Sequence, residues 1–269
     1  MVLAERMAAT RRQTLLGLAA WSGASLAQPR VARLRVATHA LPPYVIAQRN
    51  APPVGALRDF MDTDLAPRLQ LQFEWLPVMS AARVERSLRD GSAELAPLLT
   101  LSAAGVRDLQ FVHQPVLFMD SVLALRPRHP LLALGALQAS HLAGLRVGTA
   151  LGLVLPPDFD GVPVRWDVVA ATDADRAILT RVAREQLDAG YFSNPDSPRW
   201  TARHLALELH LRPLQVARRA LYPAFAPQVG SELVARYGTL AAQRFASEAW
   251  LGTLQRWMDQ AHPDAAPPA

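Results

Sequence analysis

The chain has 269 residues, of which 51% are hydrophobic, so it is long enough to bury one large core or two smaller ones. It contains no cysteine, which excludes disulfides, catalytic thiolates and zinc–thiolate sites. The formal net charge is +5, and every basic residue is an arginine, without a basic run or stripe. Nucleic-acid binders cluster their positive charge, so this pattern does not favour a nucleic-acid partner.

The first 27 residues have the composition of an export signal. Arg11-Arg12 precede an apolar run at residues 15–21, and Ser25-Leu26-Ala27 offers small residues to a signal peptidase. The arginine pair resembles a twin-arginine signal, but Thr14 stands where such signals carry phenylalanine, so the twin-arginine and general export routes both stay open. The run is too short for a membrane anchor. We therefore predict a soluble protein exported to the periplasm, with a mature chain that starts near Gln28.

The mature chain opens on a short strand that ends at a pair of prolines. Residues 34–39 alternate between two faces, as a strand does. Pro42-Pro43 ends the strand because proline donates no hydrogen bond to a sheet ladder. His39 and Tyr44 therefore lie at a carboxyl end, where open α/β sheets bind ligands. We expect Tyr44 to reach the ligand rather than to pack in the core; for His39 a ligand contact and a satisfied or solvent-facing side chain both stay open.

Helices and strands alternate through the next fifty residues. The order strand, helix, strand, helix, strand predicts a mostly parallel sheet covered by helices. The expected elements are a helix at 55–70, a strand at 71–78, a helix at 80–90 with Ser80 as its N-cap and Gly91 at its end, and a buried strand at 93–99.

A second unit of the same kind follows a longer β-like run at residues 116–125, which contains Asp120. Residues 200–215 show no clear periodicity, and residues 218–225 are β-like and would return the chain to the first unit. The other expected elements are a helix at 137–142, strands at 144–149 and 162–169, a helix at 172–186 capped by Thr172 or Asp173, a strand at 187–192, a turn-rich loop at 193–198, helices at 231–245 and 247–260, and a frayed tail.

The order of these pieces resembles the family 3 extracellular solute-binding proteins, the amino-acid-type periplasmic binding proteins of ABC importers. The resemblance spans residues 34–260 and rests on several short stretches in the right order. They are Leu-Arg-Val-Ala-Thr with Pro-Pro-Tyr at 34–44, Val-Gly-Ala-Leu at 54–57, Leu-Arg-Asp-Gly-Ser-Ala-Glu-Leu at 88–95, Phe111 with Pro115, Leu-Ala-Gly-Leu-Arg-Val-Gly-Thr at 142–149, and Leu-Asp-Ala at 187–189.

This resemblance implies an α/β protein of the two-lobed, type 2 periplasmic-binding fold. Each lobe would be a mostly parallel sheet flanked by helices, and a hinge would let the lobes close around a ligand. The export signal at 1–27 would precede a first lobe made of residues 28–120 and 216–262, a second lobe at 121–215 and a flexible tail at 263–269. The implied partners are a small-molecule ligand and an inner-membrane ABC permease or sensor protein. No cofactor is implied, and we expect a monomer.

Two ligand anchors of the family are changed in this chain. Family members that bind free amino acids hold the carboxylate with the arginine of a Thr-x-Thr-x-x-Arg stretch. Here the stretch starts at Thr100-Leu101-Ser102, Gly105 replaces the arginine, and Arg107 lies two residues later. The family's acidic acceptor for the amino group corresponds to Ser193, beside Asn194. Since a buried ammonium without a carboxylate is costly, we expect a ligand other than a standard free α-amino acid, or a receptor that has lost small-molecule binding.

The candidate ligand-binding residues lie at strand ends and in the following loops. Each has a plainer alternative: turn chemistry for Thr100 and Ser102, and a surface ion pair for Arg107. Thr149 would bind an anion only if a helix began after it, while Tyr191 and Asn194 either enter the cleft or serve core packing and a turn. The full set is His39, Tyr44, Thr100, Ser102, Arg107, Thr149, Tyr191 and Asn194.

The sequence does not favour an enzyme. It has no Gly-x-Ser-x-Gly elbow, no His-Glu-x-x-His and no phosphate-binding loop. His204 and His210 are six residues apart, which does not place them on one helix face for a metal. Asp158 and Asp160 lie in a Pro/Gly loop typical of solvated turns. A periplasmic sensor or partner-binding module with the same fold stays open beside a transport receptor.

Overall fold

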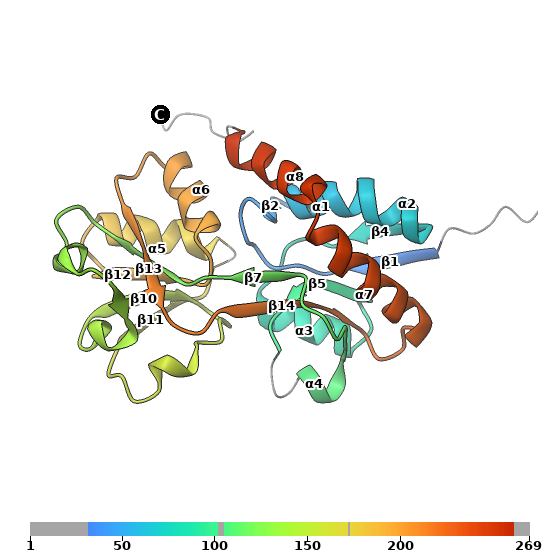
Figure 1. Ribbon diagram of the computed structural model, residues 1–269, viewed down its shortest axis with the longest axis horizontal. Helices are drawn as coiled ribbons and strands as arrows, with labels where there is room; N and C mark the ends of the chain where they lie inside the picture. The colour runs from blue at the N-terminus through green and yellow to red at the C-terminus, as the bar shows by residue number, and fades with distance from the viewer. Residues whose placement is uncertain (1–31, 102–104, 172, 261–269) are drawn as a thin grey trace, which may run out of the picture. The chain divides into compact units, whose positions relative to one another are not determined.

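The computed structural model describes residues 32–101, 105–171 and 173–260. The predicted export signal, Ser102, Thr172 and the predicted tail lie outside these residues. Two six-stranded sheets form the framework, and helices cover each of them (Figure 1). We call each sheet with its helices a lobe. Among the described helices, none is long and apolar enough to cross a membrane.

The first sheet has the strand order β4-β1-β5-β14-β6, and β7 pairs with β14. Its centre is parallel, because β1 pairs in parallel with both β4 and β5. The antiparallel partner is β14, the strand that returns late in the chain to lie beside β5, β6 and β7. The strands are β1 (Ala32–Val36), β4 (Leu71–Trp75), β5 (Leu95–Leu99), β6 (Gln110–Phe111), β7 (Leu117–Met119) and β14 (Arg219–Phe225).

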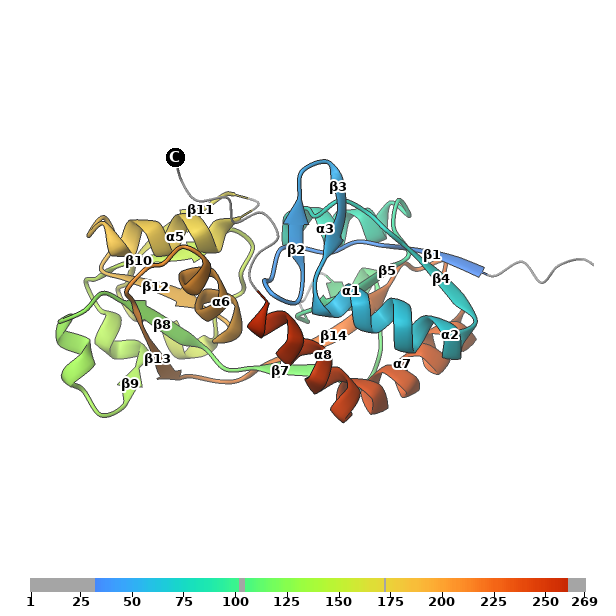
Figure 2. The same cartoon turned by 90° about the horizontal axis from the view of Figure 1, so that it is seen from above.

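The strand β4, at the edge of this sheet, has a sequence that alternates between buried and exposed residues. Leu71, Phe73 and Trp75 are buried, whereas Gln72 and Glu74 between them are exposed. This two-residue period turns one face of the strand to the core and the other to water. A further pair of strands, β2 (Ile46–Gln48) and β3 (Ala51–Val54), forms an antiparallel hairpin that the sequence did not predict (Figure 2).

The four helices predicted for the first lobe are present, and the structure adds a short, unpredicted helix at residues 105–108. The helix expected at 55–70 is a continuous helical stretch with a π-helical turn in its middle, made of α1 (Ala56–Phe60), η1 (Met61–Leu65) and α2 (Ala66–Leu69). Late in the chain, α8 packs beside α1 (Figure 1), where the ring centroids of Phe60 and Trp250 are 5.3 Å apart. The remaining helices are α3 (Ala81–Arg89), α4 (Gly105–Asp108), α7 (Ser231–Phe245) and α8 (Glu248–Asp259).

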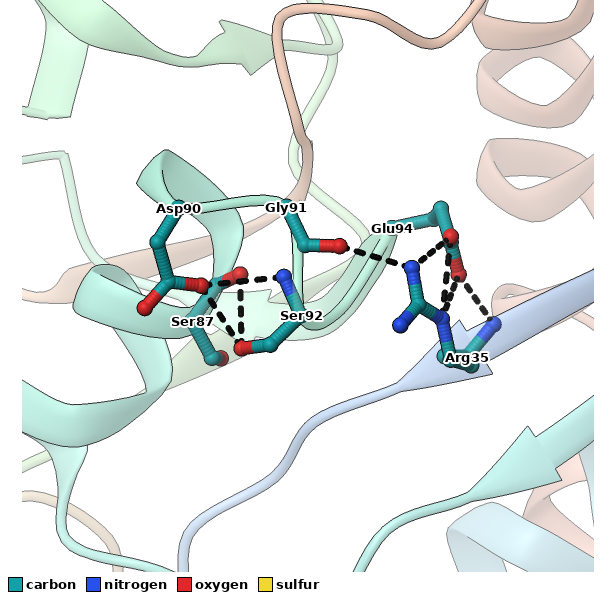
Figure 3. A network of polar contacts seen from close by, with 6 residues as sticks. All are labelled: Arg35, Ser87, Asp90, Gly91, Ser92 and Glu94. Atoms are coloured by element: carbon teal, nitrogen blue, oxygen red, sulfur yellow. Dashed lines mark hydrogen bonds and ion pairs between the residues drawn. The ribbon is translucent and has the colours of Figure 1, made fainter.

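A polar network ties the entrance of β5 to β1 (Figure 3). The carboxylate of Glu94 accepts hydrogen bonds from the backbone amide of Arg35 at 2.7 Å and from its Nε at 3.0 Å. The same guanidinium donates to the carbonyl of Gly91 at 2.6 Å. Gly91 has φ +76°, a conformation that L side chains rarely adopt. The stretch at 88–95 thus fixes a turn and pairs the charge of Glu94 with that of Arg35 in β1.

The second sheet has the order β11-β10-β12-β8-β13-β9. Parallel pairs join β10 to β11 and β12, and β13 to β9, while β8 runs antiparallel to β12 and β13. All residues of β8 and β12 are buried, as in strands covered on both faces. The strands are β8 (Val122–Leu125), β9 (Leu137–Gln138), β10 (Arg146–Ala150), β11 (Arg165–Val169), β12 (Ala189–Phe192) and β13 (His210–Gln215), and the α-helices are α5 (Ala174–Ala183) and α6 (Asp196–His204).

Two predictions for the second lobe were wrong. The expected loop at 193–198 contains the start of α6, because Asn194 Oδ1 accepts the amide of Ser197 at 2.8 Å and proline is tolerated in a first helical turn. The expected helix at 137–142 is the short strand β9 followed by the 3-10 helix η3 (Ala139–Leu142). Two further 3-10 helices are η2 (Pro130–Ala133) and η4 (Pro157–Phe159).

The β-like run at 116–125 is divided between the two sheets. It breaks at Asp120-Ser121, so β7 belongs to the first sheet and β8 to the second. The chain returns between β13 and β14, where Arg218 Nε lies 2.7 Å from Asp120 Oδ1. One ion pair therefore joins the two connections between the sheets.

Candidate functional site

A cavity of about 350 Å³ lies at the carboxyl ends of strands from both sheets. The first lobe contributes segments after β1, β4 and β5, and the second lobe contributes segments after β10, β11 and β12. The segments are 39–42, 78–81, 99–100, 150–154, 170–171 and the residue 193. Ligands of α/β sheets bind at such strand ends, and small-molecule sites start at about 300 Å³. The cavity therefore has the position and the size of a small-ligand site.

The loop after β1 is fixed by the start of helix α1. The first amides of this helix, those of Ala56 and Leu57, donate to the carbonyls of Pro43 and Tyr44 at 3.0 Å each. Gly55, which precedes the helix, has φ +134°, and a Cβ there would lie 2.5 Å from the Tyr44 carbonyl oxygen. Only glycine allows this close approach. The Val-Gly-Ala-Leu stretch thus holds the cavity wall in place.

Arg219, the first residue of β14, is a half-buried cation in the cavity wall. Its guanidinium donates to the carbonyl of Val154, in the loop after β10. Within the described part of the chain, no carboxylate forms an ion pair with it. Burial lowers the pKa of Arg219, but an arginine stays charged in a protein. The cavity therefore contains a positive charge without a counter-ion among the described residues.

His39 also lines the cavity, as a neutral side chain. Burial, and secondly the positive charge of Arg219, lower the pKa of His39 to about 4. The imidazole is therefore uncharged at neutral pH and offers one hydrogen-bond donor and one acceptor.

The acidic side chains around the cavity already have partners. Asp175, in the first turn of α5, accepts a hydrogen bond from the hydroxyl of Ser197. Its burial raises its pKa to about 6, against the opposing effect of that hydrogen bond and together with the negative charge of Asp173. Asp173 caps α5 and pairs with Arg176 at 2.9 Å, and Glu85 pairs with Arg89 at 2.9 Å. None of these three carboxylates is paired with Arg219.

Two of the predicted ligand-binding residues, His39 and Thr100, line this cavity. Tyr44 instead packs on Trp250, with ring centroids 5.7 Å apart, and its hydroxyl donates to Asp196 Oδ2 at 2.6 Å. The ring of Tyr44 thus packs in the core of the first lobe, rather than lining the cavity as we expected. Its hydroxyl contacts the first turn of α6.

The other predicted residues lie outside the cavity lining or outside the described residues. Tyr191 is buried, and its hydroxyl lies 2.8 Å from the Ser121 Oγ. Asn194 accepts the amide of Ser197 at the start of α6, and Arg107 is exposed on α4. Thr149 is buried in β10, and its hydroxyl has no hydrogen-bond partner in the structure. No helix follows β10 directly, so Thr149 does not precede an anion-binding helix start. Ser102 is not among the described residues.

Arg219 and Asp175 were missed as candidates. Arg219 follows Arg218 at the start of the returning strand, and Asp175 lies in the first turn of a predicted helix, so neither stands in a recognised motif. Ser193, which the register of the family motif identified as the changed amino-group acceptor, does line the cavity. The expectation that ligands bind at strand ends, applied also to residues 218–225, would have added Arg219 to the candidate residues.

No family model and no curated protein matches this chain. Several solved structures do match its fold. The substrate-binding protein of an amino acid ABC transporter is 12% identical, with 85% of this chain and 100% of that chain covered and a TM-score of 0.65.

Two further structures cover a similar share. The amino acid ABC transporter substrate-binding protein AbpA from Streptococcus pneumoniae, bound to L-arginine, is 16% identical, with 84% of this chain and 94% of that chain covered and a TM-score of 0.67. A histidine kinase sensor domain with similarity to periplasmic binding proteins is 16% identical, with coverages of 87% and 98% and a TM-score of 0.66. The prediction of fold class is therefore confirmed: the chain has the two-lobed fold of the substrate-binding proteins of amino-acid ABC transporters.

Proposed function

We propose that this chain is an exported solute-binding protein that captures a small ligand in the cavity between its strand ends and presents the bound form to an inner-membrane ABC importer. The observation that carries the proposal is the cavity itself, to which matching strand ends of both sheets contribute. A ligand there contacts both lobes at once, so its binding free energy favours the arrangement in which both walls touch it. No cofactor is part of this proposal.

The ligand in this proposal is not a standard free α-amino acid. Arg107, the nearest arginine to the family's carboxylate anchor, is exposed and absent from the cavity lining. A serine, Ser193, lines the cavity where the family has its acidic acceptor. An ammonium group placed beside that serine would lose its hydration, and the three carboxylates of the lining already accept from Arg89, Arg176 and Ser197. AbpA, whose structure contains L-arginine, is similar in fold, and its ligand is therefore a compound to test.

A thermal-shift screen of residues 28–269 against amino acids, polyamines, sugars and small organic acids tests the binding function. A ligand that binds only the native state raises the unfolding midpoint by mass action. Ala171 is exposed and lines the cavity, so Ala171→Trp should remove the shift by filling the site. Ala136 is exposed outside the cavity, and Ala136→Trp serves as the matched control. The proposal fails if no class of solute shifts the midpoint, or if both variants keep the shift.

The second candidate function is a periplasmic sensor or partner-binding module. The similarity to a histidine kinase sensor domain favours it, because the same fold there belongs to a signalling protein. Genes for a permease and an ATPase beside this one would support transport, whereas a neighbouring kinase, cyclase or oxidase would support sensing.

Export is tested on the intact chain. Deletion of residues 1–27 should keep the protein in the cytoplasm, and replacement of Arg11 and Arg12 by lysine separates the two export routes. A twin-arginine route is expected to be blocked by the double substitution, whereas the general route tolerates it. Cell fractionation gives the readout.

A further inference from the structure

We propose that Arg219 anchors the negative charge of the ligand, and that the ligand is a small monocarboxylate with an apolar body. This inference rests on the proposed binding function and narrows it to one class of solute. It moves the anion anchor from the segment after β5, where Gly105 at the start of α4 stands in place of the expected arginine, to the strand β14 that returns from the second lobe.

The argument starts from two adjacent arginines with opposite surroundings. Arg218 is 61% exposed and pairs with Asp120, at 2.7 Å. It also lies over the ring of Phe118, 5.4 Å from the centroid, and is not part of the cavity lining. Arg219 is half-buried in the cavity wall and forms no ion pair within the described residues. The charge of Arg218, at the surface, is therefore neutralised by Asp120, whereas the charge of Arg219, in the cavity wall, has no counter-ion among the described residues.

A half-buried cation without a counter-ion is unfavourable unless a ligand supplies the negative charge. The guanidinium has five N–H donors in a planar fork. The contact to the Val154 carbonyl uses part of this set, and the Tyr191 side chain lies beside it. Donors remain for a bidentate contact to a carboxylate, the geometry that guanidinium groups favour.

The rest of the lining favours a single negative charge on the ligand. Its other cation, Arg83, is exposed on α3, whereas three carboxylates, those of Glu85, Asp173 and Asp175, belong to the lining. The wall from the second lobe carries Asp173 and Asp175, which would repel a second carboxylate or a phosphate. Much of the remaining lining is apolar, which favours a hydrocarbon body on the ligand. The apolar side chains include Leu41, Pro42, Val78, Met119, Leu151 and Leu221, from both lobes.

Isothermal titration calorimetry with matched pairs of probes tests the inference. The probes are isovalerate, hexanoate and benzoate, each compared with its primary amide, which has nearly the same shape and no charge. At least one carboxylate is expected to bind the wild-type protein at least tenfold more tightly than its amide, the size of effect typical of a charge-assisted hydrogen bond. Arg219→Gln should remove this preference, whereas Arg218→Gln should leave it within about twofold, since a surface ion pair contributes little.

The outcomes separate this inference from the binding function on which it rests. Equal affinity for acid and amide, or equal losses in the Arg219 and Arg218 variants, overturns the role of Arg219. Binding of sugars or polyamines with no response to any carboxylate overturns the ligand class and leaves the binding function intact. Failure of every solute in the wider screen overturns both. If Arg219→Gln does not fold, Arg219→Lys decides: it keeps the charge but loses the fork, and should weaken carboxylate binding while amide binding stays unchanged.

Discussion

The two walls of the cavity occupy equivalent places in their sheets but differ in charge and in how they are held. The wall from the first lobe presents the cations Arg83 and Arg219 and the carboxylate of Glu85 beside the neutral His39 and Thr100. Helix α1 fixes this wall through amides that donate to the carbonyls of Pro43 and Tyr44. The wall from the second lobe presents Asp173 and Asp175 together with a glycine-containing loop. The similar arrangement of strands in the two lobes therefore does not fix which ligand binds. The side chains that follow each strand determine the ligand preference.

The largest expected effect on the free energy of unfolding comes from replacing a glycine in each wall by alanine. Gly55→Ala should destabilise the protein by roughly 3 kcal/mol, because its Cβ would meet the Tyr44 carbonyl oxygen at 2.5 Å and φ is +134°. Gly152, in the loop of the second wall, has φ +85°, but its Cβ would lie 3.6 Å from that of Ala81. Gly152→Ala should therefore cost only about 1 kcal/mol. Urea unfolding of both variants gives the comparison, and similar losses would show that the first wall is not the more tightly held.

The acid sensitivity of the first wall comes from His39. Its pKa is about 4 in the folded protein and 6.5 ordinarily, so the unfolded chain takes up the proton first. The stability that His39 contributes is complete above pH 6.5 and is lost as the pH falls toward 4. His39→Gln should lessen this acid destabilisation by roughly 2 kcal/mol, after allowance for the partial exposure of the ring. Unfolding free energies measured from pH 8 to 4 test this, with the exposed His113→Gln as a control that should keep the wild-type profile.

The second wall should respond to pH in the opposite direction. The folded pKa of Asp175 is about 6, above its ordinary 3.8, so the folded state holds the proton more tightly. Stability from this group is complete below pH 3.8 and is lost as the pH rises to 6. Asp175→Asn should therefore gain up to roughly 2 kcal/mol over the wild type above pH 6, less the hydrogen bond from Ser197, and nothing at pH 3.5. The exposed Asp160→Asn is the control, and a gain that does not vary with pH would contradict the assignment.

A contact between the lobes provides a smaller effect. Tyr44 belongs to the core of the first lobe, and its hydroxyl donates to Asp196, in the second lobe, at 2.6 Å. Tyr44→Phe should cost about 1.5 kcal/mol, because a hydrogen bond to a carboxylate is lost and the ring stays. Tyr222→Phe, at a half-buried tyrosine of β14, should cost less than about 0.5 kcal/mol. Chemical denaturation measures both, and equal losses would remove the special role of the Tyr44 hydroxyl.

The smallest expected effect is at the connections between the lobes. Asp120 and Arg218 are 58% and 61% exposed, and exposed ion pairs contribute little. Asp120→Asn should therefore change the free energy of unfolding by less than about 0.5 kcal/mol, and added salt should abolish the difference. A loss above 1 kcal/mol would instead make this pair a structural clamp rather than a surface contact.

The sequence by itself determined the order of the elements and the fold class. Alternation in β4, helical spacing at 55–70 and the buried strand at 93–99 follow from local periodicity, and the structure contains all three. Wrong predictions arose where the same residues are common in two kinds of structure. Asparagine and proline, as at Asn194 and Pro195, are common in turns, but here they precede helix α6. The buried amide of Ser197 donates to the Asn194 oxygen and so favours the helix start.

Only the tertiary structure decided which side chains reach the cavity. Tyr44 and Arg219 both lie at strand ends, but Tyr44 packs against Trp250, contributed by a helix some two hundred residues later, whereas Arg219 enters the cavity wall. The sequence resemblance directed attention to Arg107, because the family carries its anchor in that loop. The return of β14 beside β7 brings Arg219 to the site instead, and the partners of a strand depend on the whole chain rather than on the residues within it.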